Sequence, residues 1–378
     1  MASIKNLQGL YCLRPFVNIG ISSYNMTFCC NGSWLPGFNA GDIEKMTIWE
    51  AWNSEPMQKM RKSILDGTYG FCNKQGCPYL ISDKSRIYTR DELQAVVNGT
   101  TDGMDLESEL TNLKNLTPWI SHILDGKVIM DILPASYSLS YDESCNFKCP
   151  SCRKESTVHK SGAEYERRLK IHKDLFDEIE KQGYENIRNL VVSGSGEPFV
   201  SSIFQDLLFN FDGREYPLLR FYIMTNGVLL TPDVWNKMSK IHSNIDNIFI
   251  SMDAATERTY ESIRVNGNFK NLLANIEFLG QKRKENKLKH LAAAVIVQKK
   301  NYKEMIDIIS LCKKYNVDEV SLNSLDNWGS WSMEEYNENA VCNPVHPEHN
   351  EFLELLKNPI FDDPIVNLEN ISKYKNDR

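Results

Sequence analysis

Residues 143–155 read ESCNFKCPSCRKE and hold three cysteines close together: Cys145, Cys149 and Cys152. A structural zinc site normally takes four protein ligands, so three grouped thiolates leave one coordination position for an exchangeable ligand. Soft thiolates in a short loop also suit an iron–sulfur cluster, in which three irons each take one cysteine and the fourth iron stays open. The stretch therefore indicates a metal site that binds something besides protein.

The composition is that of an ordinary globular protein. The chain has 378 residues, 25% charged and 42% hydrophobic, and its net charge of -7 argues against a surface devoted to nucleic acid. The N-terminus lacks the features of a signal peptide, and no run of about 18 apolar residues occurs, so we expect a cytoplasmic protein with no membrane partner. In a reducing compartment the ten cysteines are expected to be metal ligands, catalytic groups or core residues rather than disulfides.

From about residue 127 onward, short apolar segments alternate with segments of helical period, which is typical of βα units around a parallel sheet or barrel. The predicted strands are residues 137–141, 189–194, 219–225, 246–253, 291–298 and 319–324. Six such units predict an α/β fold with an open (β/α)6 barrel, whose strands end at one rim. Residues that follow the strand ends, and should therefore meet at the rim, are Cys145, Gly196, Asn226 and Asp253.

Helical periodicity supports the same pattern. One predicted helix has an apolar stripe and a glycine cap; the residues are Tyr165, Leu169, His172, Phe176, Ile179 and Gly183. Another predicted helix begins with Pro232, whose missing N–H costs nothing there. Asn268 and Asn301 precede two more amphipathic segments, the second of which contains Cys312.

Four further motifs follow the cysteine loop in order. They read SGEP at residues 195–198, MTNG at 224–227, SMD at 251–253 and TYESIRVNGNF at 259–269. Together with the loop, they resemble the radical SAM superfamily over roughly residues 136–325. The resemblance implies a [4Fe-4S] cluster on the three cysteines, with S-adenosylmethionine on the open iron. In that family the reduced cluster cleaves the cofactor to a 5′-deoxyadenosyl radical, so the three cysteines are the predicted catalytic centre.

The resemblance also implies the residues that bind the cofactor. The methionine ammonium would be held by the motif made of Ser195, Gly196, Glu197 and Pro198. The ribose hydroxyls would be contacted by Asn226, Ser251 and Asp253, because an ionised carboxylate can accept two hydrogen bonds from a diol. The cofactor carboxylate would face the guanidinium of Arg264.

The sequence departs from the family pattern at two positions. Ser151 stands where an aromatic residue usually precedes the third cysteine, so Phe147 is the expected apolar contact of adenine. Ser195 replaces the first glycine of the glycine-rich motif. Taken singly, Asp253 and Arg264 could equally form a structural salt bridge or a cap.

A second set of cysteines lies in residues 12–78. A predicted hairpin ends at Cys29 and Cys30, and a helix capped by Gly67 precedes Cys72 and Cys77. Four sulfurs would meet there: Cys12, one of Cys29 and Cys30 with Cys30 preferred, Cys72 and Cys77. The set resembles the auxiliary-cluster domains called SPASM and twitch, and implies a fully ligated auxiliary iron–sulfur cluster, expected as [4Fe-4S].

Such domains ordinarily follow the barrel, so the chain resembles a circular permutation of the usual order. We predict the auxiliary domain in residues 1–82, a linker or insertion in 83–130, the barrel in 131–330 and a C-terminal extension in 331–378. A zinc ion remains an alternative for the N-terminal set. Zinc in the loop would need completion by His159 or by the pair Cys72 and Cys77.

The leading functional hypothesis is a radical SAM enzyme that abstracts a hydrogen from its substrate and receives electrons from a donor such as flavodoxin or ferredoxin. A fully ligated second cluster could accept an electron from the substrate radical, which favours an oxidation. A peptide or protein side chain is the first expected substrate, and a sugar- or aminoglycoside-like molecule, dehydrogenated or epimerised, is the second. The alternative from another class is a non-catalytic scaffold that holds zinc.

Several residues have open roles at this point. Cys312 is expected in the core, whereas Cys342 is a loop cysteine or a hydrogen-atom donor. His159 is a solvated loop residue or a proton acceptor. The segment SLDNWGSW forms either a substrate pocket or a hydrophobic plug; its candidate residues are Asp326, Asn327, Trp328 and Trp331.

Overall fold

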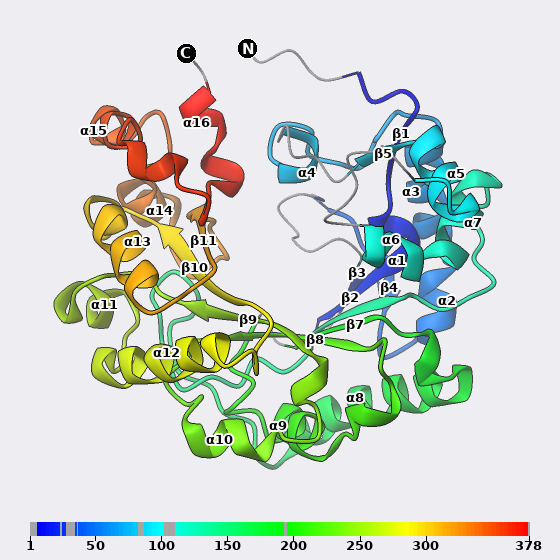
Figure 1. Cartoon of the computed structure of the whole chain (residues 1–378), viewed down its shortest axis with the longest axis horizontal. Coiled ribbons are helices and arrows are strands. Elements are labelled where there is room, and N and C mark those ends of the chain that lie inside the picture. The colour runs from blue at the N-terminus through cyan, green and yellow to red at the C-terminus, as the bar shows by residue number, and fades with distance from the viewer. Residues whose placement is uncertain are drawn as a thin grey trace. The chain divides into compact units, whose positions relative to one another are not determined.

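A computed structural model describes residues 6–22, 25–27, 35, 37–81, 87–101, 110–192 and 195–376 (Figure 1). The strands are β1 (Leu10–Cys12), β2 (Asn18–Ser22), β3 (Asn25–Thr27), β4 (Gly41–Asp42), β5 (Ile87–Thr89), β6 (Ser136–Ser140), β7 (Asn189–Val192), β8 (Arg220–Thr225), β9 (Ile245–Ser251), β10 (Leu291–Val297), β11 (Glu319–Ser324) and β12 (Val366–Asn367). The helices are α1 (Arg14–Val17), α2 (Ile48–Trp52), α3 (Glu55–Leu65), α4 (Pro78–Ile81), α5 (Arg90–Asn98), α6 (Leu110–Asn115), α7 (Thr117–Leu124), α8 (Ala163–Gln182), α9 (Ser202–Asn210), α10 (Pro232–Lys237), α11 (Glu257–Ile263), α12 (Phe269–Lys284), α13 (Met305–Lys314), α14 (Met333–Asn339), α15 (His349–Leu355) and α16 (Lys373–Asn376).

The chain divides into two compact units. Unit 1 comprises residues 1–142, 161–191 and 218–220, and unit 2 comprises residues 143–160, 192–217 and 221–378. The division differs from the predicted boundaries, because it passes through the barrel region instead of separating an N-terminal domain from it. In the described part of the chain, no helix combines the length and apolarity that a membrane crossing requires.

Unit 1 contains the predicted N-terminal hairpin, but the hairpin joins a larger sheet. β2 pairs antiparallel with β3, and on its other side it pairs parallel with β6, with Asn18 opposite Ser136. The strand order in this unit is β7-β6-β2-β3-β4. The N-terminal region is thus continuous in hydrogen bonding with the first strand of the barrel, which the local sequence did not predict.

The segment expected as a linker is folded within unit 1. β5 pairs antiparallel with β1, with Tyr11 opposite Tyr88. α5 begins with a reciprocal cap between Thr89 and Glu92 and ends at Gly99, which has the positive φ of 71° that favours glycine. α7 buries Trp119, whose indole N–H donates to a backbone carbonyl at 2.8 Å. Residues 87–101 and 110–124 therefore contribute to the core of unit 1.

A buried arginine connects several segments of unit 1. Arg61 on α3 is fully buried, and its guanidinium lies 4.2 Å from the ring centroid of Trp52. It donates hydrogen bonds to the carbonyl oxygens of Pro15, Val128 and Trp52 at 2.8–2.9 Å. Burying a charge is costly unless its donors are satisfied, and here three backbone segments satisfy them.

Unit 2 contains strands in the order β12-β11-β10-β9-β8, each parallel to its neighbours. β10 is apolar along its length and almost entirely buried, as a parallel strand covered on both faces requires. Figure 1 shows helices α10 to α13 along the outer side of these strands. Asn268 caps α12 as predicted, accepting from the N–H of Asn271 at 2.8 Å. The predicted α/β class with a partial barrel is confirmed by the alternating strands and helices.

Of the two features predicted for α8, the buried face is wrong and the glycine at its end is confirmed. α8 buries Arg168, Ile171, Leu175 and Ile179, one residue away from most of the predicted stripe. The predicted residues form a half-buried flank instead, in which His172 stacks on Phe176 at 4.5 Å and binds the hydroxyl of Tyr141 at 2.7 Å. Gly183 does end the helix, with a positive φ of 89°.

Candidate functional site

The cysteine loop begins five residues after β6 and is closed by its own backbone. The N–H of Cys145 donates to the carbonyl of Thr157 at 2.7 Å. The N–H groups of Cys152 and Arg153 both donate to the carbonyl of Cys149, at 2.9 and 3.0 Å, which makes a single helical turn. Cys145 and Cys149 are buried and Cys152 is exposed. Local backbone hydrogen bonds thus shape the loop that carries the three thiols, and the N–H of Lys148 ties it to the carbonyl of Val265 at 3.2 Å.

Each sulfur of the loop receives an N–H group. The N–H of Phe147 donates to Cys145 Sγ at 3.4 Å, Arg264 Nη1 to Cys149 Sγ at 3.8 Å and Arg153 Nη2 to Cys152 Sγ at 3.6 Å. Burial raises the pKa of Cys145 to about 11 and also raises the pKa of Cys149, whereas the neighbouring guanidinium groups act in the opposite direction. Donors and cations beside sulfur suit thiolates that bind a metal, because metal coordination deprotonates the thiol. The donor set therefore fits the cluster that the motif predicts.

Within the described ranges, no three His, Cys, Asp or Glu side chains are arranged to hold one metal ion. A four-iron cluster does not need such a group, because each cysteine binds a different iron. The thiolates of such a cluster therefore lie farther apart than the sulfur ligands of a single zinc ion, each of which lies about 2.3 Å from the metal.

Glu197 connects the loops that follow β6, β7 and β8. Its backbone N–H donates to the carbonyl of Ser144 at 2.8 Å. Its carboxylate accepts from the hydroxyl of Thr225 at 2.8 Å, from the N–H of Asn226 at 2.6 Å and from the N–H of Phe199 at 3.2 Å. Burial raises the pKa of Glu197 to about 7, against these hydrogen bonds, which lower it.

The other residues of the predicted SGEP motif surround this carboxylate. Pro198 is buried, and Ser195 and Gly196 are half-buried. The carbonyl oxygen of Ser195 accepts a hydrogen bond from Arg153 Nη2, so the motif is attached to the residue that follows the third cysteine. The structure therefore brings the motif to the cysteine loop, as its predicted role requires.

Asp253 and Arg264, predicted to bind different parts of the cofactor, form an ion pair. Arg264 Nε lies 2.5 Å from Asp253 Oδ2, and the Asp253 side chain is 2% exposed. Asp253 Oδ1 accepts from the N–H of Ile296 at 2.8 Å. The structural salt bridge that the sequence left open is present, and the same guanidinium also reaches Cys149. Contacts of the pair with a cofactor stay predictions.

The remaining predicted contacts lie at or after the ends of β8, β6 and β9. Asn226 Nδ2 donates to Asn146 Oδ1 at 3.0 Å, which connects the end of β8 to the cysteine loop. Phe147 is 1% exposed, and Gly267 leaves no room beside it: a Cβ on Gly267 would lie 3.3 Å from Phe147 Cζ. Ser251 is half-buried at the end of β9. The proposed contact of Phe147 with adenine stays a prediction.

A pocket of about 620 Å³ opens beside the cysteine loop. Its lining comes from the loop, from the turn at Val265 and from the segment that follows β11; the residues are Lys148, Pro150, Arg153, Lys154, Val265, Gly329, Ser330, Trp331, Ser332 and Glu335. The volume is in the range of small-molecule sites. Of the predicted rim residues, Trp331 lines the pocket, whereas Trp328 is 62% exposed. Asn327 Nδ2 donates to the Trp331 carbonyl at 3.2 Å and so shapes the segment.

Sequence reasoning missed the basic residues of this site. Arg153 follows the third cysteine directly and donates to Glu143 O at 2.6 Å as well as to sulfur. Its position next to a ligand was a usable signal. Lys148 and Lys154 gave no signal, because isolated lysines in a loop are usually solvated surface residues.

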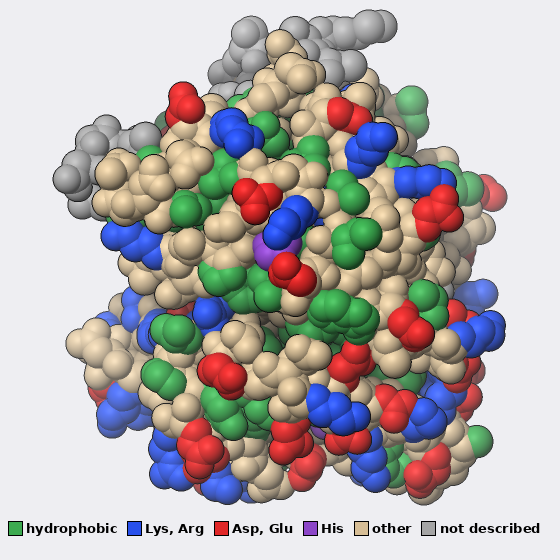
Figure 2. All heavy atoms as spheres, turned by 90° about the vertical axis from the view of Figure 1, so that its right-hand side faces the viewer, with side chains coloured by type: hydrophobic (Ala, Val, Ile, Leu, Met, Phe, Trp, Pro, Cys, Tyr) green, Lys and Arg blue, Asp and Glu red, His purple; other side chains and the backbone are tan. Residues whose placement is uncertain are grey.

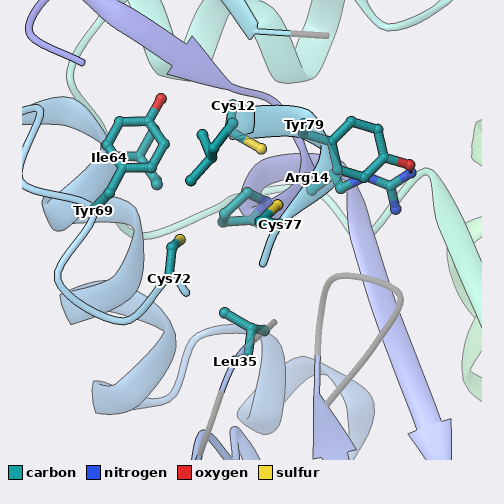
Figure 3. Close-up of a pocket in the computed structure, with 10 residues that line it drawn as sticks. Cys12, Arg14, Leu35, Ile64, Tyr69, Cys72, Cys77 and Tyr79 are labelled. Atoms are coloured by element: carbon teal, nitrogen blue, oxygen red, sulfur yellow. Dashed lines mark hydrogen bonds between the residues drawn. The ribbon is translucent and has the colours of Figure 1, made fainter. Parts of the chain in front are cut away.

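Three of the four predicted auxiliary ligands lie together in unit 1. Figure 3 shows the sulfurs of Cys12, Cys72 and Cys77 facing one small space. Burial raises the pKa of Cys72 to about 12, with further contributions from the other two thiols. Tyr69 lies beside them and donates to the carbonyl of Leu10 at 2.8 Å.

The fourth predicted ligand, Cys30, and its alternative Cys29 lie outside the described residues. The pocket lined by the other three measures about 20 Å³, the room of one water. A cluster needs more room than the three side chains leave in these positions.

The structure also describes three residues whose roles the sequence left open. Cys312 is fully buried and its thiol lies 3.6 Å from Met252 Sδ, as expected of a core residue. Cys342 is also buried, at 4% exposure, and burial raises its pKa to about 12. His159 is half-buried, and its backbone N–H donates to Ser144 Oγ at 3.0 Å.

The comparison with protein families matches the part of the chain that carries this site. Residues 141–312 match the model of the Radical SAM superfamily, a range that begins just after β6 and ends in α13. This part of the chain is a radical SAM domain. The family implies a [4Fe-4S] cluster and S-adenosylmethionine, and the matched range contains all three loop cysteines and every predicted cofactor contact. The placement of a SPASM or twitch domain is not part of this match.

Individual relatives are more distant. The AdoMet-dependent heme synthase of Methanosarcina barkeri (strain Fusaro / DSM 804) is 27% identical over 154 residues, which are 40% of this chain and 41% of that protein. The chain thus matches about two fifths of the length of that relative. Streptococcus suis SuiB has a TM-score of 0.46 at 15% identity, over 75% of this chain and 66% of that one. SuiB with its precursor peptide SuiA has a TM-score of 0.38 at 14% identity, over 86% and 64%.

Proposed function

We propose that the chain is a radical SAM enzyme that activates a C–H bond of a substrate bound beside the cysteine loop. The observation that carries the proposal is the pocket of about 620 Å³ whose wall includes the loop itself. Cys145, Cys149 and Cys152 would hold the [4Fe-4S] cluster. When bound, the cluster supplies the electron that splits S-adenosylmethionine and so yields the 5′-deoxyadenosyl radical.

The proposed task of Glu197 is to accept the ammonium group of the cofactor. An ionised carboxylate has about four lone-pair sites. Oε1 accepts from Phe199 and Thr225, and Oε2 accepts from Asn226. One acceptor site on Oε2 is therefore left for an ammonium group. A bound cation would also favour the ionised form of this buried acid.

The proposed task of Asp253 and Arg264 is to orient the cofactor, and hydrogen bonds within the protein already hold both side chains in position. The two side chains hold one another, and Ile296 holds the second oxygen of Asp253. Asp253 keeps about two further acceptor sites, enough for a ribose diol. Arg264 keeps donors that can meet a carboxylate in a two-point contact. Because neither side chain must be ordered on binding, the contacts cost little entropy.

The substrate class is also a proposal. A peptide or protein side chain is the first expectation from the sequence, but the size of the pocket favours a small molecule. The curated relative is named a heme synthase, whose product is a small molecule. Oxidative modification of a small molecule is therefore the function that we put first. A peptide substrate remains the second candidate.

The cysteine side chains that lie together in unit 1 support the proposal of an auxiliary metal site there. Cys12, Cys72 and Cys77 face one space, and a cysteine from the hairpin would complete the four ligands. When bound, a fully ligated cluster there would accept an electron, which an oxidation requires. A reduced flavodoxin or ferredoxin is the proposed electron donor.

Anaerobic reconstitution with iron and sulfide tests the first cluster. We expect about four irons for each [4Fe-4S] cluster, and release of 5′-deoxyadenosine on addition of S-adenosylmethionine and dithionite. Replacing Cys145, Cys149 and Cys152 by alanine should abolish that release. The matched control is Ser151→Ala in the same loop, which removes no ligand and should release 5′-deoxyadenosine normally. Full release from the triple variant would contradict the proposal.

The same preparation tests the auxiliary site. Replacing Cys72 and Cys77 by alanine should lower the iron content by about half and spare the release of 5′-deoxyadenosine. If unit 1 binds zinc instead, the variant should lose about one zinc per chain and no iron. The control is Cys312→Ala, which alters a buried thiol that faces no pocket cysteine.

A further inference from the structure

The pocket beside the cysteine loop carries a local excess of positive charge. Its charged lining comprises the basic residues Lys148, Arg153 and Lys154 and the acidic residue Glu335. The lining thus has three positive side chains and one negative side chain, whereas the whole chain has a net charge of -7. On the face that Figure 2 shows, acidic and basic side chains are interspersed. Charge of one sign in a concave site raises the local concentration of ions of the opposite sign.

Two of the three cations remain available to a ligand. Among the described residues, Lys148 and Lys154 form no ion pair with a carboxylate within 4.0 Å, and both side chains are exposed at the pocket. Arg153 is held by the carbonyl of Glu143 and by Cys152 Sγ, so its charge faces the thiolates of the cysteine loop, and the two lysines are the cations left for a ligand.

The acidic residue of the lining is already engaged. Glu335 caps α14, where it accepts from the N–H of Ser332 at 2.8 Å, and this hydrogen bond keeps the pKa of Glu335 below its ordinary value. The cation that acts on it through space is Lys154. Glu335 can offset at most one of the two lysine charges, and Arg153 faces a thiolate, so the pocket keeps a net positive charge of about one.

The wall of the pocket includes the flat indole ring of Trp331, and no edge of a β-sheet contributes to its lining. Trp331 is half-buried in the lining, where its ring can cover a planar or sugar-like group. No lining residue belongs to a strand, so the backbone offers no edge for an extended peptide. The shape suits a small molecule better than a chain.

We propose that the substrate of this site is an anionic small molecule, which carries a phosphate or carboxylate that Lys148 and Lys154 bind and a flat or ring-shaped part that Trp331 covers. The inference rests on the proposed function, since it names the substrate class of the same site. It excludes aminoglycoside-like polycations, which the sequence had left open, because like charges within a few ångströms repel.

Calorimetric titration of the anaerobically reconstituted full chain tests the charge of the ligand. The probes are uridine diphosphate and glucose 1-phosphate as anions, glucose as the neutral match, kanamycin as the cation and a hexapeptide of Asp and Glu. We expect the two phosphates to bind and glucose and kanamycin not to bind. The double variant Lys148→Gln, Lys154→Gln should weaken phosphate binding by about tenfold. Lys160→Gln, an exposed lysine of the same unit outside the lining, should bind as the wild type does.

The position of the ligand is tested by tryptophan fluorescence. Uridine diphosphate should quench part of the emission of the wild type, and Trp331→Phe should remove that part. Charge reversal by Lys148→Glu and Lys154→Glu should abolish phosphate binding and admit kanamycin. Circular dichroism establishes that each variant is folded before it is titrated.

Four outcomes would overturn the inference. These are equal phosphate binding in the wild type and the double variant, no phosphate binding by the wild type, preference for kanamycin, and tighter binding of the acidic peptide than of either phosphate. A parallel loss of S-adenosylmethionine affinity in the double variant would assign the pocket to the cofactor and overturn it too. Calorimetry needs no turnover, so it is independent of the release of 5′-deoxyadenosine, whose failure would count against the proposed function itself.

Discussion

The two groups of cysteines are assembled in opposite ways. In unit 2, residues 145–157 hold three thiols on a loop whose backbone hydrogen bonds are mostly local, apart from the one that the N–H of Lys148 donates to the carbonyl of Val265. In unit 1, Cys12 ends β1, while Cys72 and Cys77 lie after α3, and distant parts of the chain must meet before these thiols do. The comparison teaches that the first site depends on a local turn, whereas the second depends on the fold of its unit. Metal binding and folding should therefore be coupled more strongly in unit 1.

The largest effect should come from the side chain that holds the unit 1 site together. Tyr69 is 1% exposed, and its hydroxyl donates to the carbonyl of Leu10 on β1 at 2.8 Å. Tyr69→Ala should lower the free energy of unfolding by about 5 kcal/mol, because it leaves a cavity and an unpaired carbonyl. Urea unfolding measures the loss, and iron analysis should show that the loop cluster remains.

Tyr69→Phe is the matched control for that experiment. It keeps the ring and removes one hydrogen bond, so we expect a loss of about 1 kcal/mol. Loss of all iron in Tyr69→Ala would contradict the independence of the two cysteine groups.

The next effect concerns the ion pair that supports the loop in unit 2. Arg264→Met leaves the buried carboxylate of Asp253 with the N–H of Ile296 but without its cation. We expect the free energy of unfolding to fall by about 4 kcal/mol. Urea unfolding measures it, and the release of 5′-deoxyadenosine should fall as well.

The matched control is Arg283→Met, which breaks another Arg–Asp pair of unit 2. Arg283 and Asp318 are about a quarter exposed, so water screens the pair and the expected loss is about 1 kcal/mol or less. Equal losses in the two variants would mean that burial does not control the strength of these pairs.

A pH dependence should distinguish the two units, because it arises from Glu197 in unit 2. Burial raises the pKa of Glu197 from its ordinary value of 4.5 to about 7. Between these values the folded state binds a proton that the unfolded state has lost. The free energy of unfolding should therefore fall as the pH rises from about 4.5 to 7, by about 3 kcal/mol in total.

Glu197→Gln isolates that contribution, since an amide does not titrate in this range. Urea unfolding of the two proteins in the same metal state, between pH 5 and 8, should give a flatter profile for the variant. The absolute stabilities are not compared, because the amide also changes the hydrogen bonds to Thr225 and Asn226. Parallel profiles would contradict the assignment.

The sequence predicted the parts of the molecule that local chemistry determines. The six barrel strands lie within one or two residues of their expected bounds, because short apolar runs between helices leave few alternatives. The motif residues also meet as predicted, since parallel strands bring their ends to one rim. The cap at Asn268 and the turn at Gly183 follow from local preferences alone.

The parts that the sequence did not predict depend on distant pairing. No local signal shows that β2 pairs with β6, more than a hundred residues away. The buried face of α8 was misplaced because Arg168 looked polar, although its ion pair with Asp142 lets it be buried. The pocket lysines could not be found, because their importance comes from the turn at Val265 and the segment of Trp331 that meet them.

The smallest expected effect compares the turns beside the two cysteine groups. At Gly267, a Cβ would lie 2.6 Å from the carbonyl oxygen of Arg264 and 2.8 Å from Tyr260, so Gly267→Ala should lower the free energy of unfolding by about 2 kcal/mol. Gly70 lies two residues before Cys72 and has no atom within 4 Å of a Cβ, so Gly70→Ala should change stability by less than about 0.5 kcal/mol. Urea unfolding distinguishes these values. A larger loss at Gly70 would show that the unit 1 turn is the tighter one, and would reverse the contrast between a closely packed loop and an open one.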